Sequence, residues 1–150
     1  MIFVDASALV KRYIRERHSA AVRRLLADGP VAISRLSEVE VPSALARLVR
    51  EGRLGARARD RLVDAFAVDL ASWHVVEVTA EVTALARAAL LRHDLRAGDA
   101  VQLASALWLR QATPLTGLLA FDTRLVVAAR SEQLALPVRR AGRSRSRGPA

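Results

Sequence analysis

Short apolar runs alternate with longer helical patterns along most of this 150-residue chain. Runs at residues 1–4, 31–34, 73–78 and 115–121 have the length of strands buried on both faces. Between them, apolar residues recur at the spacing of amphipathic helices. Because parallel strands joined by helices form a sheet that is covered on both faces, the sequence predicts a three-layer α/β/α fold with a short, mostly parallel central sheet.

The helical patterns have recognisable beginnings and ends. Helices are expected at about residues 8–14, 21–27, 37–49, 56–71, 80–90, 99–107 and 123–132. Ser7 is expected to cap the first helix, and Pro42 to bend the third helix or displace its start. Gly29 and Pro30 mark the end of the second helix. A final edge strand is expected at residues 134–138.

Length and cysteine content limit the class of protein. One domain of this size is expected to bury ~70% of the surface of its extended chain. The chain has no cysteine, which excludes disulfides and thiolate metal sites. No basic segment leads into an apolar run of signal-peptide length, and charged residues interrupt every long apolar run. A cytoplasmic protein without a membrane partner is therefore expected.

The positive charge is unevenly distributed. The net charge is +9, from 24 basic and 15 acidic residues, and five of the basic residues follow position 138. The remaining 19 basic residues leave residues 1–138 with a charge of +4. A basic surface favours a polyanionic partner, although a bias toward GC-rich codons also explains an excess of arginine. Residues 139–150 contain no large apolar residue and are expected to form a disordered tail, either a solvated extension or an RNA-binding arm.

Four acidic residues, Asp5, Glu40, Asp99 and Asp122, occupy one class of position and are called the acidic quartet below. Asp5 and Asp122 each follow an apolar strand, while Glu40 and Asp99 lie where helices begin. In a parallel sheet these positions share the carboxyl end. Converging carboxylates repel one another and raise at least one pKa unless a divalent cation neutralises them. Oxygen ligands of this kind suit Mg²⁺ or Mn²⁺.

Each acid also has an ordinary structural interpretation. Asp5 and Asp122 suit turns or caps, Asp99 suits a helix cap, and Ser37 with Glu40 fits a capping box. Structural need alone does not explain why all of them fall at one end of the sheet. Glu38 is the alternative to Glu40 in the same helix.

Histidine offers no competing metal site. His18, His74 and His93 are scattered through polar or strand segments. A zinc site built on clustered histidines is therefore poorly supported, and each histidine is expected to be a surface or structural residue.

Four motifs together resemble PIN-domain proteins, specifically the VapC-type toxins of type II toxin–antitoxin systems. They are VDASALVKRY at residues 4–13, SEVEVPSALAR at 37–47, LRAGDAVQLA at 95–104 and FDTRL at 121–125. The resemblance covers about residues 1–138 and implies a PIN-like fold for that domain. It also implies that the acidic quartet is catalytic and that Asp5 and Asp99 are metal ligands.

The resemblance implies an activity and partners as well. It indicates an endoribonuclease dependent on Mg²⁺ or Mn²⁺, using one or two ions, that hydrolyses RNA phosphodiester bonds. It further implies inhibition by a cognate antitoxin protein and a homodimeric state. Many relatives carry Thr or Ser two positions before the last aspartate, where this chain has Ala120. A polar partner of Asp122 is therefore expected to be either missing or replaced by Thr123 or Ser7.

Other functions remain open from the sequence. A phosphatase of the haloacid-dehalogenase type also begins with a strand and an aspartate, but it needs a second acid at the position of Ser7. A PIN nuclease that matures RNA without being a toxin shares every motif quoted above. A non-catalytic RNA-binding module would bind RNA without cleaving it.

Overall fold

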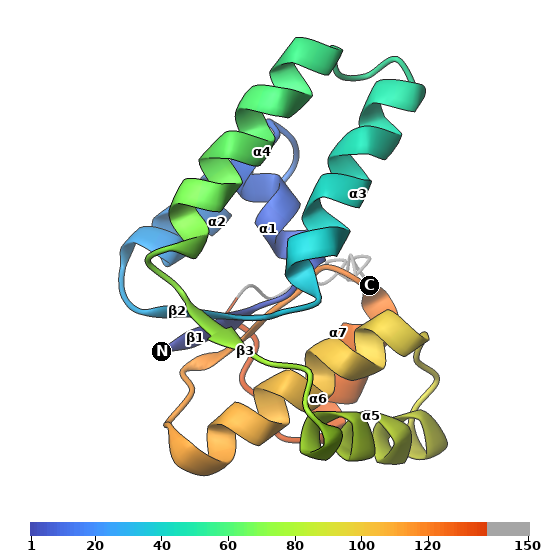
Figure 1. Ribbon diagram of the computed structural model, residues 1–150. Helices are drawn as coiled ribbons and strands as arrows, with labels where there is room; N and C mark the ends of the chain where they lie inside the picture. The colour runs from blue at the N-terminus through green and yellow to red at the C-terminus, as the bar shows by residue number, and fades with distance from the viewer. Residues whose placement is uncertain (138–150) are drawn as a thin grey trace, which may run out of the picture.

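In the computed structural model, which describes residues 1–137, a thin sheet separates two groups of helices (Figure 1). The strands are β1 (Ile2–Val4), β2 (Val31–Ser34), β3 (His74–Val76) and β4 (Gly117–Leu119). Their order is β3-β2-β1-β4, and every neighbouring pair is parallel. The predicted three-layer α/β/α fold is confirmed.

The helices divide between the two faces of the sheet. On one side lie α1 (Ala6–Tyr13), α2 (Ser19–Ala27), α3 (Ser37–Arg50) and α4 (Ala56–Leu70). On the other side lie α5 (Ala80–Arg92), α6 (Ala97–Ala112) and α7 (Thr123–Ser131). Figure 1 shows α3 and α4 extending away from the sheet as a long hairpin. No helix within residues 1–137 combines the length and apolar character needed to cross a membrane.

Each face of the sheet has its own hydrophobic cluster. Successive strand residues point to opposite faces, so Ile2 and Val4 pack against the α1–α4 side while Phe3 packs against the α5–α7 side. Each large buried side chain of this kind contributes roughly 1.5–3 kcal/mol relative to exposure. The helix α6 is buried along most of its length, which follows from apolar residues at helical spacing on it. The position of α6 matters because it carries Asp99.

The start of α1 differs from the prediction. Asp5, rather than Ser7, is the N-cap, and its Oδ2 accepts a hydrogen bond of 2.9 Å from the Ser7 backbone N–H. The helix begins immediately after the strand, so the first side chain beyond β1 is the one in position to cap. The hydroxyl of Ser7 is thereby left for another contact, with the backbone N–H of Phe121 at 3.0 Å.

The third helix begins at Ser37, where it was predicted to begin, and continues through Pro42 to Arg50. Its start is therefore not displaced by the proline. Proline has no N–H to donate, so the intrahelical bond to the Glu38 carbonyl cannot form. Packing of Val41, Leu45 and Leu48 into the cluster on this side supports the helix nonetheless.

The last part of the described chain does not form the predicted edge strand. Residues 134–137 have no strand, although the Leu118 N–H donates to the Ala135 carbonyl at 2.8 Å. This close approach requires Gly117, which has φ of +157°, because a Cβ there would lie 2.5 Å from the Ala135 oxygen. Residue 138 and the predicted tail at 139–150 lie outside the described residues.

Candidate active site

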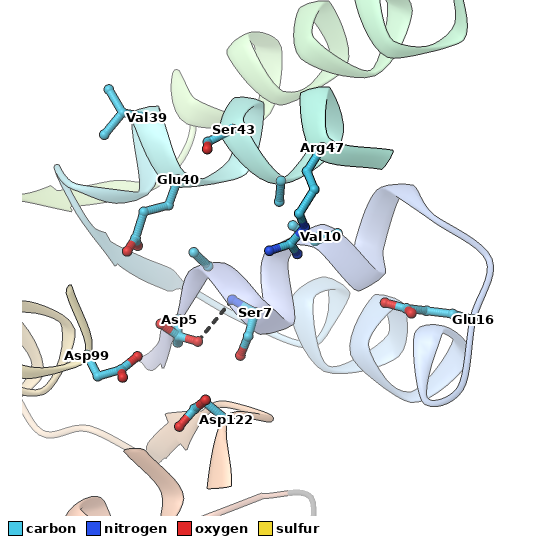
Figure 2. A pocket seen from close by; sticks show the side chains of 12 residues that line it. Asp5, Ser7, Val10, Glu16, Val39, Glu40, Ser43, Arg47, Asp99 and Asp122 are labelled. Carbon is cyan, nitrogen blue, oxygen red and sulfur yellow. Dashed lines mark hydrogen bonds between the residues drawn. The ribbon is translucent and has the colours of Figure 1, made fainter. Parts of the chain in front are cut away.

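All members of the acidic quartet line one open pocket of about 600 Å³ at the carboxyl end of the sheet. Asp5 follows β1, Asp122 lies in the connection between β4 and α7, and Glu40 and Asp99 lie in the first turns of α3 and α6. Figure 2 shows the carboxylates of Asp5, Asp99 and Asp122 facing a common space, with Glu40 reaching toward it from α3. The structure thus brings together four segments that are far apart in the sequence.

Asp5 is the most buried of the quartet, with 4% of its surface exposed. Burial raises the pKa of its carboxyl group from 3.8 to about 6, despite the opposing hydrogen bonds from Ser7. The negative charges of Glu40 and Asp99 make a smaller contribution to the same rise. Asp5 is therefore a helix cap and also one of a group of carboxylates that repel one another.

Glu40 is held by a residue of another helix. Gln102 of α6 donates from Nε2 to Glu40 Oε2 at 2.6 Å. Burial raises the pKa of Glu40, and the charge of Asp99 adds to that effect, whereas the hydrogen bond from Gln102 lowers it. The carboxylate therefore lies at the boundary between the core and the pocket.

The capping-box interpretation of Glu40 is wrong. The N-cap of α3 is Leu36, which makes no side-chain capping bond, and the Ser37 hydroxyl accepts from Gln102 Nε2 at 3.0 Å instead. Glu38, the alternative to Glu40, pairs with Arg35 and does not line the pocket. Two residues along a helix differ by about 200° in direction, so the two glutamates cannot share a target.

Asp99 is the third residue of α6, and the N-cap of that helix is Arg96. The expectation that Asp99 could be the cap is therefore wrong. Burial raises the pKa of its carboxyl group, and the nearby charge of Asp122 raises it further. A hydrogen bond from the Arg96 backbone and the charges of Arg96 and Arg124 act in the opposite direction.

Asp122 serves its own helix as well as the pocket. It is the N-cap of α7, and its Oδ1 accepts from the backbone N–H groups of Arg124 and Leu125 at 2.8 and 3.2 Å. Next to it in the chain, the backbone N–H of Phe121 donates to the Ser7 hydroxyl at 3.0 Å. The bond places the Ser7 hydroxyl beside the backbone that precedes Asp122, and its replacement of the expected hydroxyl stays a prediction.

Three further polar residues of the pocket were not singled out from the sequence: Glu16, Ser43 and Arg47. Ser43 and Arg47 lie three and seven positions after Glu40 on α3, which places them on the same face of the helix. That spacing was the available signal. Arg47 is exposed and lines the pocket. Its Nε atom lies 3.8 Å from Oε1 of Glu51. It brings a positive charge to an otherwise acidic site (Figure 2).

The pocket suits a hydrated divalent cation better than an ion enclosed by protein. Within residues 1–137, no group of three or more Asp, Glu, His or Cys side chains is already close enough to hold a metal ion. Mg²⁺ commonly keeps several waters and uses one or two carboxylates together with substrate phosphates. The donor set here is made of carboxylates, and none of the three histidines lines the pocket. The carboxylates of the acidic quartet are compatible with such a site, and the choice of Asp5 and Asp99 as the ligands stays a prediction.

Fold and pocket define a family that sequence comparison also identifies. The PIN domain profile matches residues 2–131. The chain therefore belongs to the PIN-domain family, and the resemblance expected from its motifs is confirmed.

More particularly, the chain is similar to Ribonuclease VapC35 of Mycobacterium tuberculosis, strains CDC 1551 / Oshkosh and ATCC 25618 / H37Rv. The two are 34% identical over 139 residues, which cover 91% of this chain and 95% of the relative. The chain is also similar to the crystal structure of M. tuberculosis VapC20, described as a sarcin-ricin loop cleaving toxin. The two structures superpose with a TM-score of 0.64 and 28% sequence identity, over 85% of this chain and 95% of VapC20. A toxin-antitoxin complex from Klebsiella pneumoniae shares the fold, with a TM-score of 0.58, 16% identity, and coverage of 83% and 88%.

Proposed function

We propose that this protein is a divalent-metal-dependent endoribonuclease that hydrolyses RNA phosphodiester bonds and acts as the toxin of a type II toxin–antitoxin pair. The observation that carries the proposal is the convergence of the acidic quartet in one open pocket. Similarity to a protein named as a ribonuclease and to a toxin that cleaves the sarcin-ricin loop supports RNA as the substrate.

The quartet divides into two roles. Asp5 and Asp99 would hold Mg²⁺ or Mn²⁺, which supplies a bound water of lowered pKa and positive charge beside the scissile phosphate. Glu40 and Asp122 are the carboxylates that orient the attacking water and accept its proton. Burial raises the pKa of the Glu40 carboxyl group, which makes Glu40 a stronger proton acceptor than a carboxylate of ordinary pKa.

Arg47 gives the pocket its contact with the RNA backbone. Its exposed guanidinium lies on the face of α3 that also carries Glu40 and Ser43. Arginine donates to phosphate oxygens in a fixed fork geometry, so Arg47 can hold a phosphate that flanks the cleaved bond. The net positive charge of residues 1–138 favours RNA binding that weakens as the salt concentration rises.

The wider setting follows from the same proposal. A growth-inhibiting ribonuclease requires an inhibitor in the cell that makes it, so a cognate antitoxin is proposed as the protein partner. Solved relatives include a toxin-antitoxin complex, which supports this partner. A homodimer and a cytoplasmic location belong to the proposal as well.

The test combines cleavage in vitro with growth. Purified wild-type protein and Asp99→Asn are incubated with total RNA in Mg²⁺, Mn²⁺ or EDTA, and the new RNA ends are sequenced. Glu38→Gln is the matched control, because it removes a carboxylate of α3 that lies outside the pocket. We expect cleavage at defined sites by the wild type and the control, and none by Asp99→Asn or in EDTA.

The same experiment separates the alternative functions. Cleavage without growth arrest after induction would indicate a nuclease that matures RNA. RNA binding without cleavage, in Mn²⁺ and with an intact pocket, would indicate a binding module. Full cleavage by metal-replete Asp99→Asn would remove Asp99 from the site.

A further inference from the structure

Gln102 is a polar residue in an otherwise apolar part of α6. Only 1% of its surface is exposed. Its Nε2 donates to Ser37 Oγ at 3.0 Å and to Glu40 Oε2 at 2.6 Å. Its Oε1 is buried without a hydrogen-bond partner among the residues that the structure describes. The amide nitrogen of Gln102 therefore donates two hydrogen bonds, whereas its amide oxygen accepts none.

The orientation of this amide follows from Glu40. A buried carbonyl without a partner is unfavourable, and turning the amide over would allow the Ser37 hydroxyl to donate to Oε1. The same rotation would set Oε1 against Glu40 Oε2, so that two acceptors would face each other. The observed orientation leaves a carbonyl unsatisfied and gives its donor to the carboxylate. A residue selected only for core packing has no need of this arrangement.

Gly98, one turn before Gln102 on α6, shapes the other side of the same carboxylate. A Cβ at this position would lie 2.8 Å from Glu40 Oε1. Gly98 lies at the second position of α6 and does not have a left-handed φ, so the backbone does not require glycine there. The absence of a side chain is needed for Glu40. Both oxygens of Glu40 are therefore positioned by α6. Gln102 donates a hydrogen bond to Oε2, and Gly98 leaves the space that Oε1 occupies.

We infer that Gly98 and Gln102 are positioning residues that hold the Glu40 carboxylate at a fixed place in the pocket. Asp99 lies between them in the sequence, in the first turn of the same helix. One helix thus supplies one carboxylate of the quartet and fixes the position of a second carboxylate from α3. The inference rests on the proposed function for its catalytic meaning, whereas the placement of Glu40 is measurable without any activity.

Gln102→Met is the informative variant, because methionine has a similar length, lacks the donor, and removes the unsatisfied carbonyl. We expect only a small change in melting temperature, because removal of the unsatisfied carbonyl offsets the loss of the donor to Ser37 Oγ and Glu40 Oε2. We expect kcat for RNA cleavage to fall roughly tenfold or more, as for other residues that orient a functional ligand, with KM little changed. A purely structural glutamine would show the reverse, a loss of stability with kcat retained.

Two further measurements make the inference decisive. In the double variant Glu40→Gln/Gln102→Met, cleavage should be no weaker than in Glu40→Gln alone, because Gln102 acts through Glu40. In Gly98→Ala, the flexible end of the Glu40 side chain can yield to the new methyl group. The protein should therefore fold, and kcat should fall as in Gln102→Met.

The placement of Glu40 is tested directly by ¹³C NMR of its carboxyl group in the metal-free protein. We expect the signal to shift in Gln102→Met and Gly98→Ala, and to stay in place in Glu38→Gln. An unchanged Glu40 signal in both α6 variants, or additive losses in the double variant, would overturn the inference. Since the NMR experiment needs no cleavage, an inactive wild type would count against the proposed function and not against the placement of Glu40.

Discussion

The hydroxyl of Ser7 and the backbone N–H of Phe121 form a hydrogen bond of 3.0 Å, although 114 positions separate them in the sequence. The bond joins the start of α1 to the connection that leads into α7. Ser7 also donates its own backbone N–H to Asp5, and Asp122 follows Phe121 directly. One serine therefore links the segments that carry two members of the acidic quartet, and it fixes the spacing between them.

Ser7→Ala should separate those two segments without removing the cap of α1. The Asp5 cap uses the Ser7 backbone, which is retained, whereas the partly buried Phe121 N–H loses its acceptor. We expect a loss of about 1–2 kcal/mol in the free energy of unfolding, measured with urea. We also expect RNA cleavage to fall by more than the loss of folded protein alone would cause. Ser7→Thr keeps a hydroxyl and is the control. Equal cleavage by Ser7→Ala and wild type would show that the bond does not position Asp122.

The raised pKa of Asp5 predicts a pH-dependent stability in EDTA. Its carboxyl group has a pKa of about 6 in the folded state against 3.8 as the reference, so the folded state binds the proton more tightly. The stability that this proton gives is complete below pH ~3.8 and is lost as the pH rises through ~6. At neutral pH the buried charge costs up to about 3 kcal/mol.

Asp5→Asn should remove this cost, because asparagine stays neutral and still caps α1. We expect the variant to match wild type near pH 4 and to be more stable than wild type above pH 6. The measurement is a urea titration at several pH values without metal. Asp5→Ala, which also loses the cap, should gain less. A difference between Asp5→Asn and wild type that does not change with pH would contradict the raised pKa.

Metal binding should reverse the electrostatic cost of the quartet. At ~100 times its dissociation constant, a divalent ion adds ~2.7 kcal/mol to the stability of the folded state, which corresponds to several degrees in melting temperature for a chain of this size. Asp99→Asn should be more stable than wild type in EDTA, because the repulsion with Asp122 is reduced. It should lose most of the shift with Mg²⁺ or Mn²⁺.

Glu38→Gln is again the control in that melting series, since Glu38 pairs with Arg35 outside the pocket. It should keep the full metal shift. If Asp99→Asn is less stable than wild type in EDTA and still keeps the full shift, Asp99 is a structural residue of α6 and not a metal ligand.

Arg47→Gln should weaken RNA binding through the phosphate backbone alone. Loss of one phosphate contact to a single strand should reduce the slope of log K against log salt concentration by roughly 0.7. We expect KM to rise and kcat to change little. Arg59→Gln on α4 is the control, because Arg59 pairs with Asp60 and does not line the pocket. An unchanged salt slope in Arg47→Gln would exclude a phosphate contact.

Sequence patterns predicted the parallel sheet and the positions of the acidic quartet for the same reason. A continuous apolar run followed by an acid marks both a buried strand and the edge where parallel strands end, as at Asp5 and Asp122. The pocket confirms that the four carboxylates meet at one edge. Their catalytic and metal-binding roles stay predictions until the variants above are measured.

Other features depended on packing that no local pattern encodes. Whether Glu38 or Glu40 enters the pocket depends on which face of α3 packs against the rest of the protein. A sequence pattern locates the start of a helix only to within one or two residues, and an error of that size exchanges the expected positions of the two glutamates. The bond from Gln102 to Glu40 joins residues 62 positions apart, and in the sequence Gln102 is one of several polar residues of α6 with nothing to mark it. Asp5 replaced Ser7 as the cap because both residue types satisfy the same need.

The two hydrophobic clusters divide the acidic quartet between the two sides of the sheet. Asp5 and Glu40 are carried by elements of the α1–α4 side, and Asp99 and Asp122 by elements of the α5–α7 side. Proteins open locally in cooperative units before they unfold as a whole. Opening of either cluster would separate one pair of carboxylates from the other while much of the chain stays folded. The highest temperature at which the protein works is therefore expected to be set by the weaker cluster, below the temperature at which the whole domain melts.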